Sequence, residues 1–359
     1  MGGGLLQLVA YGAQDVYLTG NPQITFFKVV YRRHTNFSIE SIQQTFNGNA
    51  TLGQRVTCQI SRNGDLVHKL YLQATVTAIG DAKDVGHKLI EQVEVEIGGQ
   101  MIDRQYGEWM YIWNELTLPT GKQEGFKRMI ASTGANATTI YVPLEFWFCR
   151  NIGLALPLIA LQYHEVKINL TLGSENALGG NTATVTNVEL WADYIFLDTD
   201  ERRRFAQLSH EYLIEQVQFT GSEAINSSNL SAKLSFNHPV KELIWQGKKE
   251  EDIIKLGNTK LMLNGNDRFA ERDTMYFTHV QPYQHHTNIP DRDCNINVYS
   301  FALKPEEHQP SGTLNMSRID TAQLKISNIS QGTGEVKIYA HSYNVLRILS
   351  GMGGLAYSN

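Results

Sequence analysis

Hydrophobic and polar residues alternate one by one along much of this chain. Every second position is apolar in several segments of the first half, at 56–60, 70–76, 93–97, 166–172 and 188–196. This period of two is typical of a β-strand with one buried face and one face in water. Turn residues such as Asn63-Gly64 and Gly98-Gly99 tolerate the positive φ that tight hairpins need. The pattern therefore predicts antiparallel β-sheets.

The alternation stops between Asp103 and Leu118. Apolar residues there recur at helical spacing, at Tyr106, Trp109, Met110, Trp113 and Leu116. We interpret this stretch as a helix that packs over the end of a β-sandwich or into a subunit contact, because aromatic stripes are mostly buried. An exposed aromatic platform at Trp109 and Trp113 is the alternative. A second short helix is expected at Glu124–Ser132.

The longest dense run of charge, DTDERRRFAQLSHE at 198–211, divides the chain into two halves. Alternation resumes after it with Leu213, Glu215, Val217 and Phe219. Further strand-like segments follow at 230–236, 240–245, 260–263, 298–303, 322–327 and 335–345. We interpret the charged run as the connector between two sandwiches.

The two halves resemble each other. EIGGQMID (96–103) and MLNGNDRF (262–269) each combine a strand, a Gly turn and a short return. Each half also has a Pro-containing loop that leads into a strand, at 155–170 and 309–326, and ends in an alternating strand, WADYIFL or YAHSYNVL. About eight strands per half with long connections fit a jelly roll better than an immunoglobulin-like sandwich.

We therefore expect an all-β fold: a double jelly roll of two eight-stranded antiparallel β-sandwiches in tandem, with short helices in loops. The expected parts are an N-terminal arm at 1–25, a first jelly roll at 26–197, a linker at 198–212, a second jelly roll at 213–345 and a C-terminal tail at 346–359. The arm is rich in Gly and has no Lys or Arg. We read it as extended rather than helical, and we expect it to serve assembly, because its apolar residues need a partner.

Composition narrows the function. Of the 359 residues, 42% are hydrophobic and 19% are charged, which indicates a globular chain. The formal net charge is −5, whereas a protein that grips nucleic acid is normally basic, so no direct nucleic-acid binding is expected. No apolar run approaches the ~20 residues of a membrane span, and the first residues lack the basic start of a secretory signal. We expect synthesis and assembly in the cytosol.

Candidate chemical sites give no catalytic constellation. His285 and His286 are adjacent and lack the spacing of a cupin metal site, and no zincin, Walker or nucleophile-elbow motif occurs. We read the carboxylate pairs Glu94/Glu96 and Glu250/Glu251 as solvated charge. The basic clusters 32–34 and 202–204 are read as ion-pair partners. Cys58, Cys149 and Cys294 have no metal spacing. The sequence therefore predicts no catalytic residue, no cofactor and no metal, and it leaves glycosylation positions open.

Long blocks of the chain resemble a known family. They include LVAYGAQDVYLTGNPQITFFKVVYRR (8–33), GLALPLIALQYHEVK (153–167), DYIFLDTDERRRFAQLSHEYLIEQVQFTGSE (193–223), YSFALKPEEHQPSGTLNMSRID (299–320) and YNVLRILSGMGGLAYSN (343–359). These blocks are similar to the major capsid proteins of nucleocytoplasmic large DNA viruses, and closest to the chlorella-virus (phycodnavirus) type. One departure is the short connection between Pro239 and Leu263, where the algal proteins carry long insertions.

The resemblance implies a structural capsid protein without catalytic activity. Its homotrimer would form a pseudo-hexagonal capsomer that tiles the icosahedral shell of a large dsDNA virus. The implied location is the virion capsid, with assembly in the host cytoplasm. Implied partners are neighbouring capsomers, minor capsid proteins and the inner viral membrane. The apolar loop Leu154–Leu161 and the Trp109 helix are expected to supply surface for the trimer.

Two alternatives stay open from the residues. The first is a minor capsid or host-glycan-binding jelly-roll module, whose mark would be an exposed aromatic patch at Trp109 and Trp113. The second is a cupin-like enzyme, whose mark would be a bound metal.

Overall fold

The computed structural model describes residues 12–77, 84–131, 137–178, 183–249, 252–291, 294–330 and 333–357. The chain divides into two compact units, Met1–Asn36 and Phe37–Asn359.

The first sandwich contains two antiparallel sheets. One has the strand order β1-β9-β3-β6, with the short β7 paired to β3, and the other has the order β2-β8-β4-β5. The strands are β1 (Phe37–Gln44), β2 (Arg55–Gln59), β3 (Leu66–Thr77), β4 (Ile90–Ile97), β5 (Gln100–Tyr106), β6 (Ala137–Pro143), β7 (Leu156–Pro157), β8 (Val166–Leu172) and β9 (Thr184–Leu197).

The second sandwich repeats this plan. One sheet has the order β10-β19-β12 with β16 beside β12, and the other has the order β11-β18-β14-β15. Short strands β13 and β17 also pair with β12, and β20 pairs with β19. The strands are β10 (His210–Ile225), β11 (Leu230–Leu234), β12 (Pro239–Lys249), β13 (Asp252–Ile254), β14 (Asn258–Leu263), β15 (Asn266–Asp267), β16 (Asn297–Ser300), β17 (Leu314–Asn315), β18 (Ala322–Ser327), β19 (Gly334–Leu349) and β20 (Met352–Leu355).

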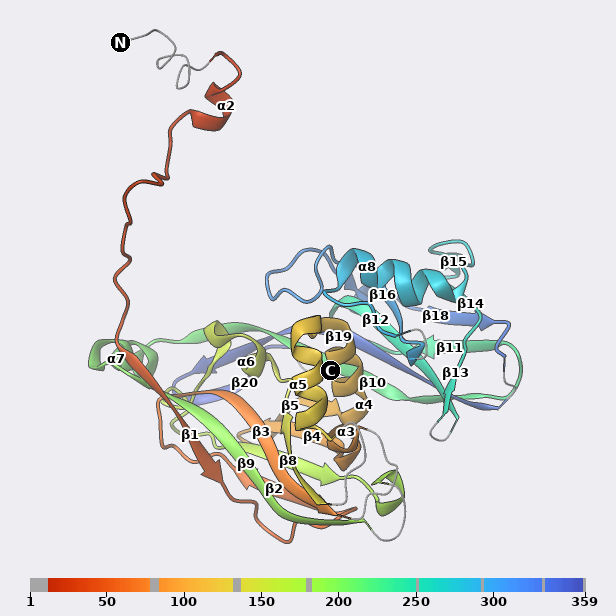
Figure 1. Cartoon of the computed structure of the whole chain (residues 1–359), viewed down its shortest axis with the longest axis horizontal. Coiled ribbons are helices and arrows are strands. Elements are labelled where there is room, and N and C mark those ends of the chain that lie inside the picture. Colours follow the sequence, from red (N-terminus) through yellow and green to blue (C-terminus); the bar gives the residue numbers. More distant parts are fainter. Residues whose placement is uncertain are drawn as a thin grey trace. The chain divides into compact units, whose positions relative to one another are not determined.

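Both sandwiches share one strand order. If the eight principal strands of each are counted along the chain, each sandwich consists of a 1-8-3-6 sheet and a 2-7-4-5 sheet. This connectivity is that of a jelly roll. The predicted repeat is therefore confirmed, and the chain is a double jelly roll (Figure 1).

Short helices lie in the connections. They are α3 (Val85–Leu89), α4 (Gly107–Thr117), α5 (Thr120–Met129), α6 (Trp147–Arg150), α7 (Thr199–Gln207) and α8 (Gln281–His285), with 3-10 turns η1 (Ile152–Leu154), η2 (Glu175–Leu178) and η5 (Met316–Arg318) and the π-helix η3 (Tyr276–Val280), which leads directly into α8. The two helices expected after Asp103 correspond to α4 and α5. Among the described residues, no helix has the length and apolar character of a membrane span.

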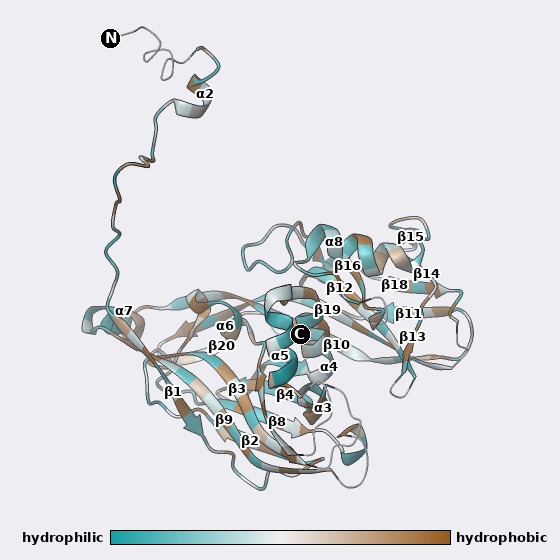
Figure 2. Ribbon diagram, in the orientation of Figure 1, coloured by the Kyte–Doolittle hydropathy of each residue, from teal (hydrophilic) through white to brown (hydrophobic). Residues whose placement is uncertain are grey.

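The alternating pattern of apolar residues corresponds to alternating burial in the strands, as expected. In β3, Leu70, Leu72, Ala74 and Val76 are buried, and the residues between them are partly exposed. Strand ribbons in Figure 2 show the same change of colour from residue to residue. The second sandwich has its own core around Leu243 and Trp245. The larger core contains residues of both sandwiches, so hydrophobic contact runs continuously between them.

Element boundaries differ from the sequence interpretation at three places. The first strand starts at Phe37, not near residue 26, because the apolar stretch before it pairs with no other strand. The charged connector folds as α7, which Asp198 caps by accepting a hydrogen bond from the Thr199 amide. The tail joins the fold, because β20 pairs with β19.

The N-terminal unit is described from Gly12. It contains one helical turn, α2 (Val16–Thr19), where a fully extended arm was expected. The large apolar side chains between Ile24 and Tyr31 are 72% to 99% exposed.

A glycine pair tests the close packing at the start of α4. A Cβ atom at Gly107 would lie 2.0 Å from the His87 carbonyl oxygen, whereas one at Gly125 in α5 would meet nothing within 4 Å. Gly107→Ala should lower the free energy of unfolding by about 3 kcal/mol. Gly125→Ala should raise it by about 0.5–1 kcal/mol, because Ala loses less backbone entropy in a helix. Urea unfolding at one protein concentration measures both. Equal effects would contradict the packing described for Gly107.

Candidate functional site

Helix α4 lies where the two sandwiches meet. It follows β5 directly, and its aromatic residues stack at a spacing of four, with the Trp109 and Trp113 rings 5.8 Å apart. Trp109 packs against Tyr339 at 5.6 Å, and Trp113 packs against His341 at 5.0 Å. Both tryptophans are buried, with 1% and 4% exposure. The packed-helix interpretation is confirmed, and an exposed platform at these residues is wrong.

The surface that α4 covers is the outer face of sheet β10-β19-β12. Residues opposite each other in antiparallel strands share a face, and the pairs here are Phe219 with Tyr339 and Ile244 with Tyr339. Ile244 and Tyr339 are buried in the core shared with the first sandwich. Their neighbours Leu243 and Ala340 point to the second sandwich's own core. This sheet is therefore buried on both faces.

Ion pairs flank the aromatic contact. Glu108 of α4 lies 2.9 Å from the Nζ atom of Lys248 and 2.8 Å from that of Lys337. Burial alone would raise the pKa of Glu108, but the two ammonium groups lower it below its usual value. The helix of one sandwich thus supplies the counterion for two cations of the other.

A second set of charges is centred on Glu215 in β10. Arg150 of α6 approaches it at 2.7 Å, and Lys241 of β12 at 2.8 Å. The Arg150 guanidinium also lies over the Trp113 ring, 4.7 Å from its centroid. Burial opposes ionisation of Glu215, but Arg150 and hydrogen bonds to histidines hold its pKa well below the usual value. The Arg150–Glu215 pair joins the two sandwiches.

The buried network of charged side chains extends to His286. Its Nε2 lies 2.9 Å from a Glu242 oxygen and its Nδ1 lies 3.0 Å from Glu306. His341 lies between Glu242 and Glu215, at 3.2 Å from each. Carboxylates only accept, so both ring N–H groups of His286 donate. Burial lowers the pKa of His286, but Glu242 and Glu306 outweigh it and raise this pKa to about 9.

Each member of this buried network depends on its partners for compensation of its charge. Removing one partner of a buried ion pair typically costs about 3–5 kcal/mol, because the other charge stays buried without compensation. A well-packed apolar replacement of the whole set is often neutral. The geometry therefore favours one relative placement of Arg150 and Glu215.

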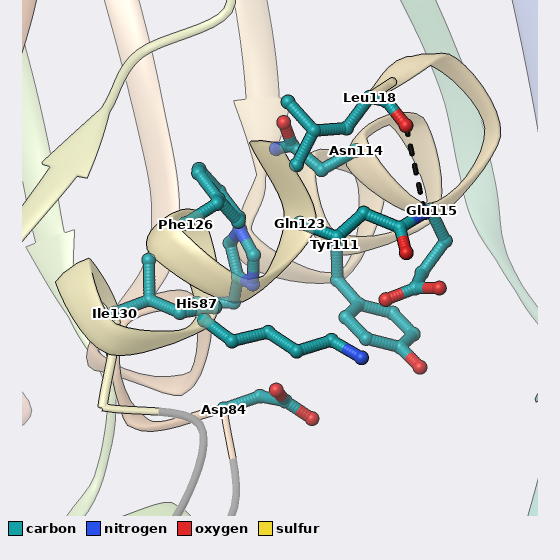
Figure 3. A pocket seen from close by; sticks show the side chains of 10 residues that line it. Asp84, His87, Tyr111, Asn114, Glu115, Leu118, Gln123, Phe126 and Ile130 are labelled. Carbon is teal, nitrogen blue, oxygen red and sulfur yellow. Dashed lines mark hydrogen bonds between the residues drawn. The ribbon is translucent and has the colours of Figure 1, made fainter. Parts of the chain in front are cut away.

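A small cavity lies beneath α5 (Figure 3). It is lined by residues of α3, α4 and α5, including His87, Tyr111, Glu115 and Phe126, and its volume is about 10 Å³. This volume holds about one water molecule and no organic substrate. Neither ring nitrogen of His87 has a hydrogen-bond partner among the described residues. Burial lowers the pKa of His87 to about 4, so the imidazole is neutral at neutral pH.

Comparison with known proteins identifies the family. Residues 25–198 match the family described as the major capsid protein N-terminus, and residues 201–254 and 253–354 match the large eukaryotic DNA virus major capsid protein. A major capsid protein of Pyramimonas orientalis virus is 58% identical over the full length of both chains. This chain belongs to the major capsid proteins of large eukaryotic DNA viruses. It is a structural component of the virion capsid.

Further relatives agree with this assignment. The major capsid protein of Paramecium bursaria Chlorella virus 1 is 43% identical over the full length of both chains. A chain in the quasi-atomic model of the PBCV-1 virus capsid is 40% identical, with a TM-score of 0.84 over 93% of this chain and 100% of that one. The Faustovirus major capsid protein has the same fold, with a TM-score of 0.78 at 12% identity over 94% of each chain. The resemblance to the phycodnavirus type is thus confirmed.

The remaining candidate residues make hydrogen bonds and ion pairs within the chain. His285 and His286 point to different partners, the Leu303 carbonyl and the two glutamates. Within the described ranges, no three His, Cys, Asp or Glu side chains are grouped as metal ligands. The expected absence of a metal stays a prediction. Arg202 pairs with Asp65 and Arg204 with Glu201, as the ion-pair interpretation of this cluster predicted.

Three sequence interpretations need detail or correction. Glu94 is buried and pairs with Arg55 and Arg104 at 2.6 Å each, so it is not solvated charge. Glu250 and Glu251 lie outside the described residues. Arg32, Arg33 and His34 are exposed in the N-terminal unit. The cysteines are unpaired, and two of them are buried.

The sequence analysis missed the buried network. One signal was present: Glu215 occupies an apolar phase between Leu213 and Val217, and Lys241-Glu242 interrupts an otherwise apolar strand. A charge in a core position of a strand requires a partner. The partner Arg150 is 65 positions before Glu215 in the numbering and has no such signal.

The raised pKa of His286 predicts an alkaline loss of stability. Its folded-state pKa of about 9 lies above the ordinary value of 6.5, so the stabilisation is complete below pH 6.5 and disappears as the pH rises through 9. The difference in unfolding free energy between the parent and His286→Gln should shrink by about 3 kcal/mol over this window. Urea unfolding of both proteins from pH 6 to pH 10 measures it. A difference that is constant with pH would contradict the charged network.

Proposed function

We propose that this capsid protein forms a homotrimer that acts as a pseudo-hexagonal capsomer. The supporting observation is the repeated strand order: two jelly rolls per chain give six similar blocks in a trimer. Six similar blocks suit a lattice in which each capsomer has six neighbours. The similarity to a chain of the PBCV-1 virus capsid agrees with assembly into a shell.

The proposed role is architectural. In this proposal the chain has no catalytic residue, cofactor or metal, it binds no nucleic acid directly, and the shell is assembled in the host cytoplasm. The net charge of −5 supports the part concerning nucleic acid. Glycan binding through Trp109 and Trp113 is not part of it, because both rings are buried in the chain.

The two segments that the sequence analysis expected to supply the trimer contact are not exposed. Most of the loop Leu154–Leu161 is buried within the chain, and so are Trp109 and Trp113 of α4. Neither feature is left over for a subunit contact. Exposed apolar side chains lie elsewhere, for example at Tyr141, Met275 and Tyr283.

The trimer is tested by its mass. Static light scattering at micromolar concentration should give three times the chain mass of 40.4 kDa. Obligate interfaces of this kind bury roughly 2,000 Å² or more, so dissociation at this concentration is not expected. A monomer under these conditions would contradict the proposal.

We further propose that the N-terminal unit, Met1–Asn36, which includes the expected arm at 1–25, serves assembly. Ile24, Phe26, Phe27, Val29, Val30 and Tyr31 are all exposed. Contiguous exposed apolar side chains are rare on the surface of a soluble protein, and they usually mark an interaction site. The arm's partners in this proposal are neighbouring capsomers, minor capsid proteins and the inner viral membrane.

Deletion of residues 1–35 separates assembly from folding. The described side chains of this region contribute little burial, so the melting temperature should change by less than about 2 °C. The trimer should persist, and incorporation of a tagged truncated chain into purified virions should fall sharply against the tagged full-length chain. Loss of the trimer would make the arm part of the domain fold. Normal incorporation would make it dispensable.

A further inference from the structure

One segment of the N-terminal unit exposes apolar and basic side chains together. It is ITFFKVVYRRH at 24–34, which we call the apolar–basic segment, and all of its residues are exposed. Six of its side chains are large and apolar, and Lys28, Arg32 and Arg33 add three positive charges. The segment therefore offers two kinds of interaction to one partner.

The positive charge of this segment is not balanced by neighbouring acids. No Asp or Glu occurs between Asp15 and Glu40, and the chain as a whole has the opposite sign, with a formal net charge of −5. The other basic cluster, at 202–204, is different, because Asp65 and Glu201 pair with two of its arginines. Cations without nearby acids attract an anionic surface.

The order of the apolar side chains indicates what kind of surface this is. Residues 24–34 are described without helix or strand, and successive side chains of an extended chain point to opposite sides. Because Phe26 and Phe27 are adjacent, and so are Val29 and Val30, apolar groups lie on both sides of the segment. A sheet edge or a rigid groove covers mainly one side of such a chain. The fluid boundary between lipid headgroups and acyl chains can surround it.

We propose that the apolar–basic segment binds the surface of an anionic lipid membrane. The rings of Phe26 and Phe27 enter the boundary between headgroups and acyl chains, and Lys28, Arg32 and Arg33 pair with the lipid phosphates and carboxylates. The segment lies in the interface and does not span, because unpaired backbone groups are too costly in the hydrocarbon core. This proposal rests on the assembly role of the N-terminal unit and names the chemistry of its partner.

Nucleic acid is the competing anionic partner. Aromatic rings between basic residues also bind single strands, because bases stack on the rings. Half of the large apolar side chains here, Ile24, Val29 and Val30, are aliphatic and have no ring for stacking. Such side chains gain from burial among lipid chains. The composition of the segment therefore favours lipid, and DNA enters the test as a separate ligand.

Vesicle flotation with the full-length protein tests the proposal. Vesicles of phosphatidylcholine are compared with vesicles of equal parts phosphatidylcholine and phosphatidylserine. A Lys or Arg near an anionic surface strengthens binding about fivefold, so three should give a preference of roughly 100-fold or more for the anionic vesicles. Salt at about 1 M should remove most of this preference, because it shortens the Debye length to about 3 Å.

A charge variant and a matched control locate the electrostatic part. The triple variant Lys28→Gln, Arg32→Gln, Arg33→Gln should lose the preference for anionic vesicles. Its control removes the same charge from exposed positions of α5, through Lys122→Gln, Lys127→Gln and Arg128→Gln. The control should bind as the parent does.

An apolar variant locates the contact with the lipid chains. The double variant Phe26→Ser, Phe27→Ser should bind anionic vesicles about 10-fold more weakly or worse, because two exposed rings no longer leave water. Tyr163→Ser, Leu303→Ser is the control, since these side chains are 75% and 73% exposed and lie outside the segment. It should bind as the parent does. Circular dichroism should match the parent for both segment variants, because the changed side chains are exposed.

The outcomes separate lipid binding from the assembly role. A parent protein that ignores anionic vesicles, or that binds labelled single- or double-stranded DNA more tightly than these vesicles at equal salt, would overturn the proposal. Segment variants that bind as tightly as the controls would overturn it as well. If vesicle binding fails while chains without residues 1–35 are still excluded from virions, only the lipid partner is wrong. If vesicle binding is found and these shortened chains are incorporated normally, only the assembly role is wrong.

Discussion

Burial of charge between the two sandwiches is the constraint on which the rest of the structure depends. Glu215 in the second sandwich and Glu108 in the first each face cations that the other sandwich supplies. An unpaired charge at these positions would be costly, since it would lose water without gaining a counterion. The sandwiches are therefore held in one arrangement, which agrees with the single compact unit that extends from Phe37 to the end of the chain.

The equivalent outer sheet faces of the two sandwiches differ in their side chains. The covered sheet face of the second sandwich contains Glu242 and His341, both buried. The outer face of sheet β1-β9-β3-β6 in the first sandwich has neutral aromatic rings at its centre, Tyr71 and Trp191. A contact within one chain never meets water after folding, so it tolerates ionic groups that pair with each other. Tyrosine and tryptophan combine an apolar ring with a polar group, so partly exposed rings of this kind are tolerated in water.

The N-terminal unit and the sandwiches differ in how far their apolar side chains are buried. In the sandwiches, strand pairing places every second side chain in a core. In the N-terminal unit, six large apolar side chains within eight positions are exposed. The sandwiches and the N-terminal unit thus differ in how much of their large apolar side chains is buried.

The sequence by itself determined the strands, the duplication and the family. Alternation is a local property, because successive side chains of a strand point to opposite faces, and so Leu70 to Val76 could be read directly. The stripe of Trp109 and Trp113 likewise predicted a packed helix. The sequence did not show that Phe26 to Tyr31 fails to form a strand, because a strand needs a pairing partner, and the partner is not visible in local pattern. Nor did it show that Arg150 meets Glu215, or that Tyr71 and Trp191 form a stripe across strands distant in sequence. Those facts depend on register and on sheet order, which only the tertiary structure decides.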